Sequence, residues 1–298
     1  SRGTLVNVKR ILVIADRKDS SQKALAHAAL MAEQFNATLH VVGFSYERLS
    51  VLDESMTKED IELAKQKIIH ANQTWLDEAV VMNSLPKSTT DEMVWSKDIA
   101  TWVTKHCVNH KYDLILKTGH RSEHAFYVPT DWHLLRNGSA PVLLVAEKKW
   151  RKKQAIMVTL DMASKKKTKQ ALNQQVIDAG KMLAAANDMP LHVCFSLAIS
   201  PVLKDLGIVD KNKSVKAAKS KYIPKIQAMF GDDGIPLENI HIKSGYADKV
   251  VPSVASDIGA ALVIMGSVGR KGLKAKVLGN TAESVLALLK TDVMIIQP

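Results

Sequence analysis

Two kinds of hydrophobic pattern follow each other along this chain. Short continuous runs of Val, Ile and Leu, bounded by turn residues, are separated by longer stretches in which apolar residues recur at helical spacing. Continuous apolar runs are typical of strands that are covered on both faces, as in a parallel sheet with helical crossovers. The spacing predicts helices over 17–36, 58–83, 97–109 and 130–138, and again over 163–187, 213–231, 247–259 and 281–290. We therefore expect an α/β fold in which each half holds five strands and four helices in a doubly wound, Rossmann-like layer.

The two halves of the chain repeat each other at an offset of about 150 residues. An apolar run that ends in Asp16 is matched by a run that ends in Asp161. The next apolar runs both begin Leu-His-Val, at Leu39 and at Leu191. The sequence therefore contains one structural unit written twice.

The domain boundary is placed by the same repeat. We expect an N-terminal domain over 1–147 and a C-terminal domain over 154–298, joined by the basic stretch between them. The last apolar run of each unit, 142–145 or 293–296, would be an unpaired sheet edge, and such edges invite pairing. The two runs are therefore predicted to pair antiparallel, so that one chain imitates a dimer.

Composition narrows the classes of function. The formal net charge of +11 raises nucleic acid as a partner. Lysine runs such as 165–167 are common on solvated linkers and helix surfaces, so we favour that interpretation over nucleic-acid binding. No apolar run approaches the roughly 20 residues that span a bilayer. Cys107 and Cys194 have neither metal-site nor redox-site spacing. A cytoplasmic protein is the expectation.

One glycine-spaced loop in the second unit carries candidate chemistry. Gly266 and Gly269 follow the fourth predicted strand of that unit, and Gly279 comes directly before Asn280 and Thr281, where the last helix opens. Glycines let the backbone approach a ligand closely, and the amides at a helix N-terminus suit a phosphate. Ligands bind at the carboxyl ends of strands in open α/β sheets, which is where this loop is expected to lie.

The spacing Gly-x2-Gly-x9-Gly, after a strand that ends in Met265, closely resembles the ATP-binding motif of universal stress proteins. The family usually has Ser or Thr after the last glycine, where this chain has Asn280 followed by Thr281. The resemblance covers essentially the whole chain as two family units. It implies a stress-response protein that binds ATP or a related nucleotide, with Mg²⁺ as a possible companion ion.

The resemblance also assigns roles to residues of the second unit. It implies that Asp161 contacts the adenine and ribose end of the nucleotide and that the backbone of Val193 contacts the adenine edge. The positions that match the ribose and phosphate contacts are Met265, Gly266, Val268, Gly269, Gly279, Asn280 and Thr281.

The first unit departs from the motif at three positions. Thr118 stands in place of the first glycine, Val128 in place of the last, and Pro129 follows it. Valine disfavours positive φ, and proline removes an amide that would face a phosphate. Although Asp16 is kept, we expect this unit to hold an altered site or a structural partner.

Histidines suggest a metal site that we discount. His106 and His110 have i, i+4 spacing beside Cys107, and His120 and His124 repeat that spacing. Zinc ligands favour such spacing, but neither a carboxylate nor a second cysteine completes a tetrahedral set in the sequence pattern.

The preferred function is nucleotide binding in the C-terminal domain, with a signalling or protective role, an unknown protein partner and no strong catalysis. Three alternatives stay open. The first is a weak ATPase, in which Asp161 is the one acid placed to help a metal. The second is a protein that binds another phosphate-containing or amphipathic ligand, such as a nucleotide sugar. The third is a protein that binds nucleic acid through the lysine runs.

Overall fold

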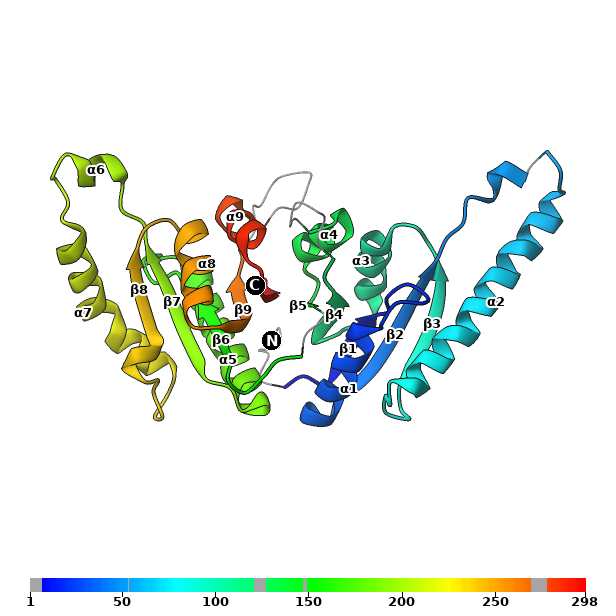
Figure 1. The fold of residues 1–298 in the computed structure, drawn as a ribbon, viewed down its shortest axis with the longest axis horizontal. Coiled ribbons are helices and arrows are strands. Elements are labelled where there is room, and N and C mark those ends of the chain that lie inside the picture. Colours follow the sequence, from blue (N-terminus) through cyan, green and yellow to red (C-terminus); the bar gives the residue numbers. More distant parts are fainter. Residues whose placement is uncertain (1–6, 53, 121–126, 147–148, 269–277) are drawn as a thin grey trace.

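The computed structural model describes residues 7–52, 54–120, 127–146, 149–268 and 278–298. Ten strands form one sheet in the order β3-β2-β1-β4-β5-β10-β9-β6-β7-β8. The order is the same in both halves when each is followed outward from the middle, so the chain is an elongated molecule with its two halves related by a pseudo-twofold axis (Figure 1). The expected pair of doubly wound α/β units is confirmed.

Both units use the same succession of elements. The strands of the first unit are β1 (Arg10–Ile14), β2 (Thr38–Ser45), β3 (Thr90–Trp95), β4 (Leu114–Thr118) and β5 (Val142–Val145). Its helices are α1 (Lys23–Phe35), η1 (Leu49–Leu52), α2 (Lys58–Met82), α3 (Ile99–Asn109) and α4 (Pro129–Asn137). The strands of the second unit are β6 (Ala155–Thr159), β7 (Leu191–Leu197), β8 (Ile240–Ser244), β9 (Ala260–Gly266) and β10 (Asp292–Ile296). Its helices are α5 (Lys167–Asn187), α6 (Pro201–Asp205), α7 (Lys211–Met229), η2 (Leu237–Asn239), α8 (Ala247–Asp257) and α9 (Asn280–Leu288).

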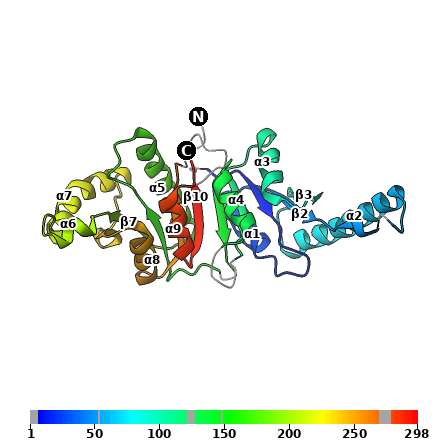
Figure 2. The same cartoon turned by 90° about the horizontal axis from the view of Figure 1, so that it is seen from above.

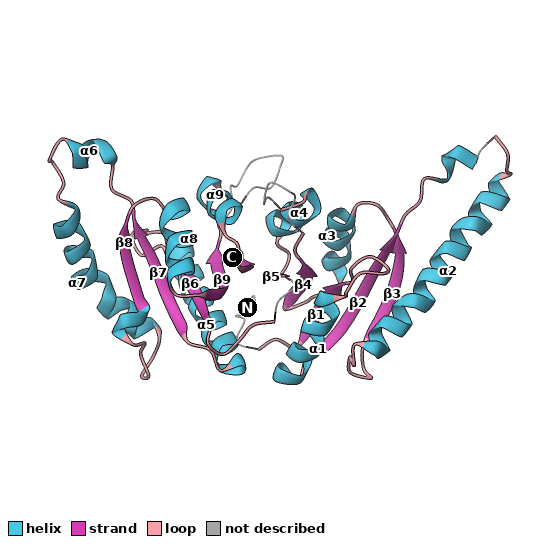
Figure 3. Ribbon diagram, viewed as in Figure 1, coloured by secondary structure: helices cyan, strands magenta, loops and turns pink. Residues whose placement is uncertain are grey.

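Helices cover both faces of the sheet (Figure 3). Side chains from α1, α2, α5 and α7 pack in one core with the strands, and side chains from α3, α4, α8 and α9 pack in the other. The strands are buried between these layers, which explains their continuous apolar runs. Within the described ranges, no helix is long and apolar enough to cross a membrane.

The two units join through β5 and β10 at the centre of the molecule (Figure 2). The strands pair antiparallel, with Leu144 opposite Val293 and Val142 opposite Ile295. Arg136 of α4 also contacts Glu283 of α9, with Nε donating to Oε1 at 2.7 Å. The prediction of an intrachain pseudo-dimer through the last strands is therefore confirmed.

The helix predictions miss at the same place in both units. Helices expected from 17 and 163 begin instead at Lys23 and Lys167, because the chain forms a loop at the end of each first strand. The second unit also contains the short helix α6, which the hydrophobic spacing did not indicate.

Candidate functional site

A cavity of about 460 Å³ opens at the carboxyl ends of β6, β7 and β9 in the second unit. This is the end of a parallel sheet at which ligands bind in α/β folds, and the volume falls within the usual range for ligand pockets. Seven of the nine residues expected at a nucleotide site line it, namely Asp161, Met265, Gly266, Val268, Gly279, Asn280 and Thr281. The structure thus brings together residues that are more than a hundred positions apart in the sequence.

Asp161 is held at the rim of this cavity by its neighbours. The amide of Asn173 spans the loop, because its Oδ1 accepts from the Asp161 backbone N at 3.1 Å and its Nδ2 donates to the Asp161 carbonyl at 3.0 Å. The Asp161 carboxylate pairs with Lys169 Nζ at 2.9 Å, and its side chain is 49% exposed. An exposed pair of this kind is weak, so the carboxylate can exchange Lys169 for a ligand hydroxyl at little cost.

The two described glycines of the motif are needed for different reasons. A Cβ on Gly266 would lie 2.6 Å from Cγ of Leu172, so this glycine allows α5 to pack closely on the end of β9. Gly279 has φ +108°, a conformation that L side chains rarely adopt, and a Cβ there would meet nothing within 4 Å. Gly266 is therefore needed for close packing, whereas Gly279 is needed for the positive-φ turn at the start of α9, beside the cavity.

The amino end of α9 faces the same cavity. Gly279 is its N-cap, and Asn280 is its first helical residue. The first amides of a helix have no partner within it, and together with the helix dipole they favour an anion.

The loop between β9 and α9 is closed at its base by Ser267. Its hydroxyl donates to the carbonyl of Leu278, and its backbone N bonds to Ile296 at 2.9 Å. Gly269, which we expected at the phosphates, lies outside the described residues, as do the loop cations. The loop cations are Arg270, Lys271, Lys274 and Lys276.

Val193 lies beside the cavity rather than on its wall. It is fully buried in β7, where it pairs with Val158 on one side and Ile240 on the other. The β7 residues that line the cavity begin one position later, at Cys194 and continuing through Ser196. The backbone contact assigned to Val193 therefore stays a prediction.

Sequence reasoning missed several residues that line the cavity. Lys169, Asn173, Phe195 and Tyr246 all belong to its wall. The side chain of Lys169 and the ring of Tyr246 supply a cation and an aromatic surface that no motif pointed to. Lys169 follows a lysine run that we had assigned to solvated surface, and its position in the first turn of α5 was the available signal.

In the first unit, side chains at the carboxyl ends of the corresponding strands are hydrogen-bonded to one another. Thr118 Oγ1 donates to Asp16 Oδ2 at 2.8 Å and accepts from the Ala24 backbone N at 3.1 Å. His120 Nε2 lies 3.3 Å from Asp16 Oδ1. Burial opposes ionisation of Asp16, but the bonds from His120 and Thr118 outweigh it and lower the pKa of this carboxyl. Asp16 is therefore held by two side chains, whereas the Asp161 carboxylate pairs with Lys169 among the residues that the structure describes.

A buried ion pair lies beside this network. Lys117 Nζ donates to Asp131 Oδ1 at 2.7 Å and to the Thr118 carbonyl at 2.9 Å. The His120 backbone N donates to Asp131 Oδ2 at 2.7 Å. Asp131 is the third residue of α4, whose N-cap is Val128 with φ −65° and whose first residue is Pro129. A carboxylate of the chain thus occupies the amino end of the helix that corresponds to α9.

The three described histidines of the discounted metal pattern do not form one group. His106 and His110 stack with ring centroids 4.1 Å apart, and His110 Nδ1 bonds to the carbonyl of His106 at 3.0 Å. His120 belongs to the Asp16 network, and His124 lies outside the described residues. The i, i+4 spacing therefore does not converge on one ion in the part of the chain that is described.

Known proteins match the chain over nearly its whole length. The model of the universal stress protein family matches residues 7–146 and again 154–297. Universal stress protein E homolog of Haemophilus influenzae is 30% identical over 304 residues, covering 97% of this chain and 97% of that protein. Universal stress protein E of Escherichia coli K12 is 27% identical over 97% of this chain and 94% of its own length.

Solved structures share the fold. A functionally unknown protein from Pseudomonas aeruginosa PAO1 has a TM-score of 0.75 at 23% identity, covering 99% of this chain and 94% of its own. A universal stress protein from Archaeoglobus fulgidus has a TM-score of 0.63 at 16% identity, covering 97% and 98% of the two chains. With two family matches in tandem and a relative at 30% identity along its length, the chain belongs to the universal stress protein family.

Proposed function

We propose that the second unit binds a nucleoside phosphate of the ATP type and that the protein acts in the stress response through that binding, without strong catalysis. One observation carries the proposal. The amino end of α9, Gly279 in its positive-φ turn and the Asp161 carboxylate all border one cavity at the carboxyl ends of the strands.

Each part of a nucleotide has a chemically suitable partner in that cavity. The first amides of α9 and the ammonium of Lys169 can bind phosphates. The Asp161 carboxylate can accept hydrogen bonds from ribose hydroxyls, and the aromatic rings of Phe195 and Tyr246 can pack against the base. A cavity with these partners favours a nucleotide over an uncharged apolar ligand.

Hydrolysis has weaker support than binding. Of the described residues that line the cavity, Asp161 is the one carboxylate that could hold Mg²⁺. Phosphoryl transfer depends on metal ions and on a residue that orients the attacking water. We therefore propose binding with at most slow turnover.

The test is calorimetric titration of the full chain with ATP, comparing Gly279→Val with a matched control. Valine at Gly279 forces the N-cap toward the negative φ that Val128 adopts in the first unit, which moves the first amides of α9. The backbone preference lost is about 1–3 kcal/mol, so the affinity for ATP is expected to fall by about 5- to 150-fold. Gly231→Val is the control, because Gly231 also has positive φ (+82°) and open space but lies outside the cavity lining.

The control should lose some stability and keep ATP affinity within about twofold. Equal ATP affinity in Gly279→Val and in the unaltered protein would contradict the phosphate-site assignment. A parallel titration with a nucleotide sugar, in which that ligand bound and ATP did not, would replace ATP by the alternative ligand class.

A further inference from the structure

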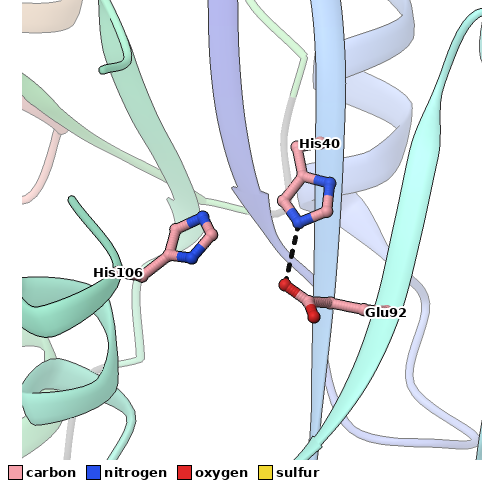
Figure 4. A group of neighbouring side chains, drawn as sticks. All are labelled: His40, Glu92 and His106. Atoms are coloured by element: carbon pink, nitrogen blue, oxygen red, sulfur yellow. Dashed lines mark hydrogen bonds and ion pairs between the residues drawn. The ribbon is translucent and has the colours of Figure 1, made fainter. Parts of the chain in front are cut away.

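Three potential metal ligands meet in the first unit, away from the nucleotide cavity (Figure 4). They are His40 on β2, Glu92 on β3 and His106 on α3, and each offers one ligand atom within 4.8 Å of the other two. His40 Nε2 and Glu92 Oε1 are 3.0 Å apart. The sequence hid this group, because its members come from three different elements and only His106 stood in a recognisable spacing.

Strand register brings the first two ligands together. His40 lies opposite Thr90 in the β2–β3 ladder, and Val42 lies opposite Glu92, so His40 and Glu92 are diagonal neighbours on one face of the sheet. Thr90 Oγ1 holds His40 Nδ1 at 2.7 Å, which directs Nε2 to Glu92. An oxygen partner on the second ring nitrogen is the arrangement that orients metal-binding histidines.

His106 is oriented in a similar way from the helix. Its Nε2 lies 2.7 Å from the hydroxyl of Tyr112, which leaves Nδ1 as its candidate ligand atom. The ring stacks on Trp102 with centroids 4.4 Å apart. The tyrosine hydroxyl and the tryptophan ring together fix the orientation of the His106 ring.

We propose that His40, Glu92 and His106 bind a divalent transition-metal ion of the zinc class, with water completing the coordination. Two imidazoles and one carboxylate form a known zinc ligand set with an open position. Zinc–ligand distances of about 2.0–2.2 Å place tetrahedral ligand atoms about 3.4 Å apart. The His40 and Glu92 atoms, 3.0 Å apart, are within about 0.4 Å of that spacing. The ligand atom of His106 lies within 4.8 Å of the other two, so it has to approach by at most about 1.4 Å.

Access to the site is open. The side chains of His40 and Glu92 are 19% and 42% exposed, so an ion can enter without unfolding. The carboxylate offsets one of the ion's two positive charges, and neutral imidazoles suit zinc better than magnesium or calcium.

The second unit contains a natural comparison for this site. His192 on β7 corresponds to His40, and its Nδ1 lies 2.8 Å from Nε2 of His241 on β8. The eighth residue of α3 is His106, but the eighth residue of α8 is Val254. The second unit therefore has two ligands where the first has three, and we expect it to bind the ion much more weakly.

The test is calorimetric titration of the tag-free, EDTA-treated full chain with ZnCl₂, supported by the visible absorption of Co²⁺. One ion per chain is expected, with Co²⁺ absorption in the range of tetrahedral coordination. His106→Ala and Glu92→Gln should each weaken Zn²⁺ binding at least about tenfold, and His192→Ala should leave it within about twofold. Glu92 is partly exposed, so Glu92→Gln is expected to fold, and circular dichroism verifies this.

Two outcomes would overturn the proposal. One is the lack of stoichiometric Zn²⁺ binding to the unaltered protein, which would leave the three side chains as a hydrogen-bonded aromatic stack. The other is binding that His192→Ala weakens as much as His106→Ala does. ATP titration of the same variants is independent of both outcomes, because none of these residues lines the nucleotide cavity.

Discussion

The carboxyl ends of the strands are built differently in the two units, although the backbone plan is the same. In the second unit they border a cavity, and in the first they are joined by hydrogen bonds among Asp16, Thr118 and His120 and by the Lys117–Asp131 pair. Met265 and Ala282 stand where the first unit has Lys117 and Asp131. The same fold can therefore hold a buried ion pair at the amino end of one helix and a cavity at the amino end of the equivalent helix.

The largest effect, on the free energy of unfolding, is expected when Lys117 of the first unit is replaced by the methionine that the second unit has at the equivalent position. Lys117→Met leaves the Asp131 carboxylate buried without its cation, because the two side chains are 7% and 0% exposed. Removing one partner of a buried pair costs about 3–5 kcal/mol. Urea unfolding should show a loss of that size in the free energy of unfolding.

The double variant Lys117→Met/Asp131→Ala is the control, since it copies both residues of the second unit. It should recover most of the lost stability because no buried charge remains. A double variant as unstable as the single one would show that the ion pair is not the reason for the loss.

A smaller effect, on ATP affinity, is expected at the two equivalent aspartates that follow the first strand of each unit. Asp161→Asn removes a half-exposed carboxylate at the cavity rim and should lower ATP affinity about tenfold, in line with the strength of a hydrogen bond to a charged group. Asp16→Asn changes a carboxylate that is held by Thr118 and His120 and should leave the affinity unchanged. Calorimetry on both variants decides this, and equal losses would mean that both units bind nucleotide.

The smallest effect concerns pH. Hydrogen bonds from His120 and Thr118 overcome burial and hold the pKa of Asp16 below its ordinary value. A carboxyl of this kind adds stability above its unfolded pKa of about 3.9, and that stability is lost as the pH falls through the lower folded value. Asp16→Asn should therefore flatten the acid side of the stability curve below about pH 4. An unchanged slope in acid-unfolding curves would count against an ionised Asp16.

Much of the fold was predictable from the sequence because it rests on periodic patterns. The repeat and the buried apolar runs indicated ten strands, and the unpaired last runs indicated the β5–β10 junction. The helix starts at Lys23 and Lys167 were not predictable, since the side-chain amides of Gln22 and Asn173 hold the preceding loops through backbone contacts that have no periodic signature.

The site was predictable only where it follows a local motif. Gly279 and Asn280 are adjacent in the chain and were placed at the cavity, as was Asp161 at a strand end. Lys169, Tyr246 and the Glu92 carboxylate beside His40 gain their meaning from tertiary proximity, so spacing along the chain could not reveal them.

The antiparallel β5–β10 junction has a consequence for how the two sites can change. Identical subunits that pair across a twofold axis carry every substitution twice, so both sites gain or lose a ligand together. Here both halves are encoded separately yet share one sheet, and their association does not depend on protein concentration. The first half can therefore carry Thr118, Val128 and Lys117 where the second half carries Gly266, Gly279 and Met265. Because the two halves are covalently linked, their sequences can differ while the halves stay paired.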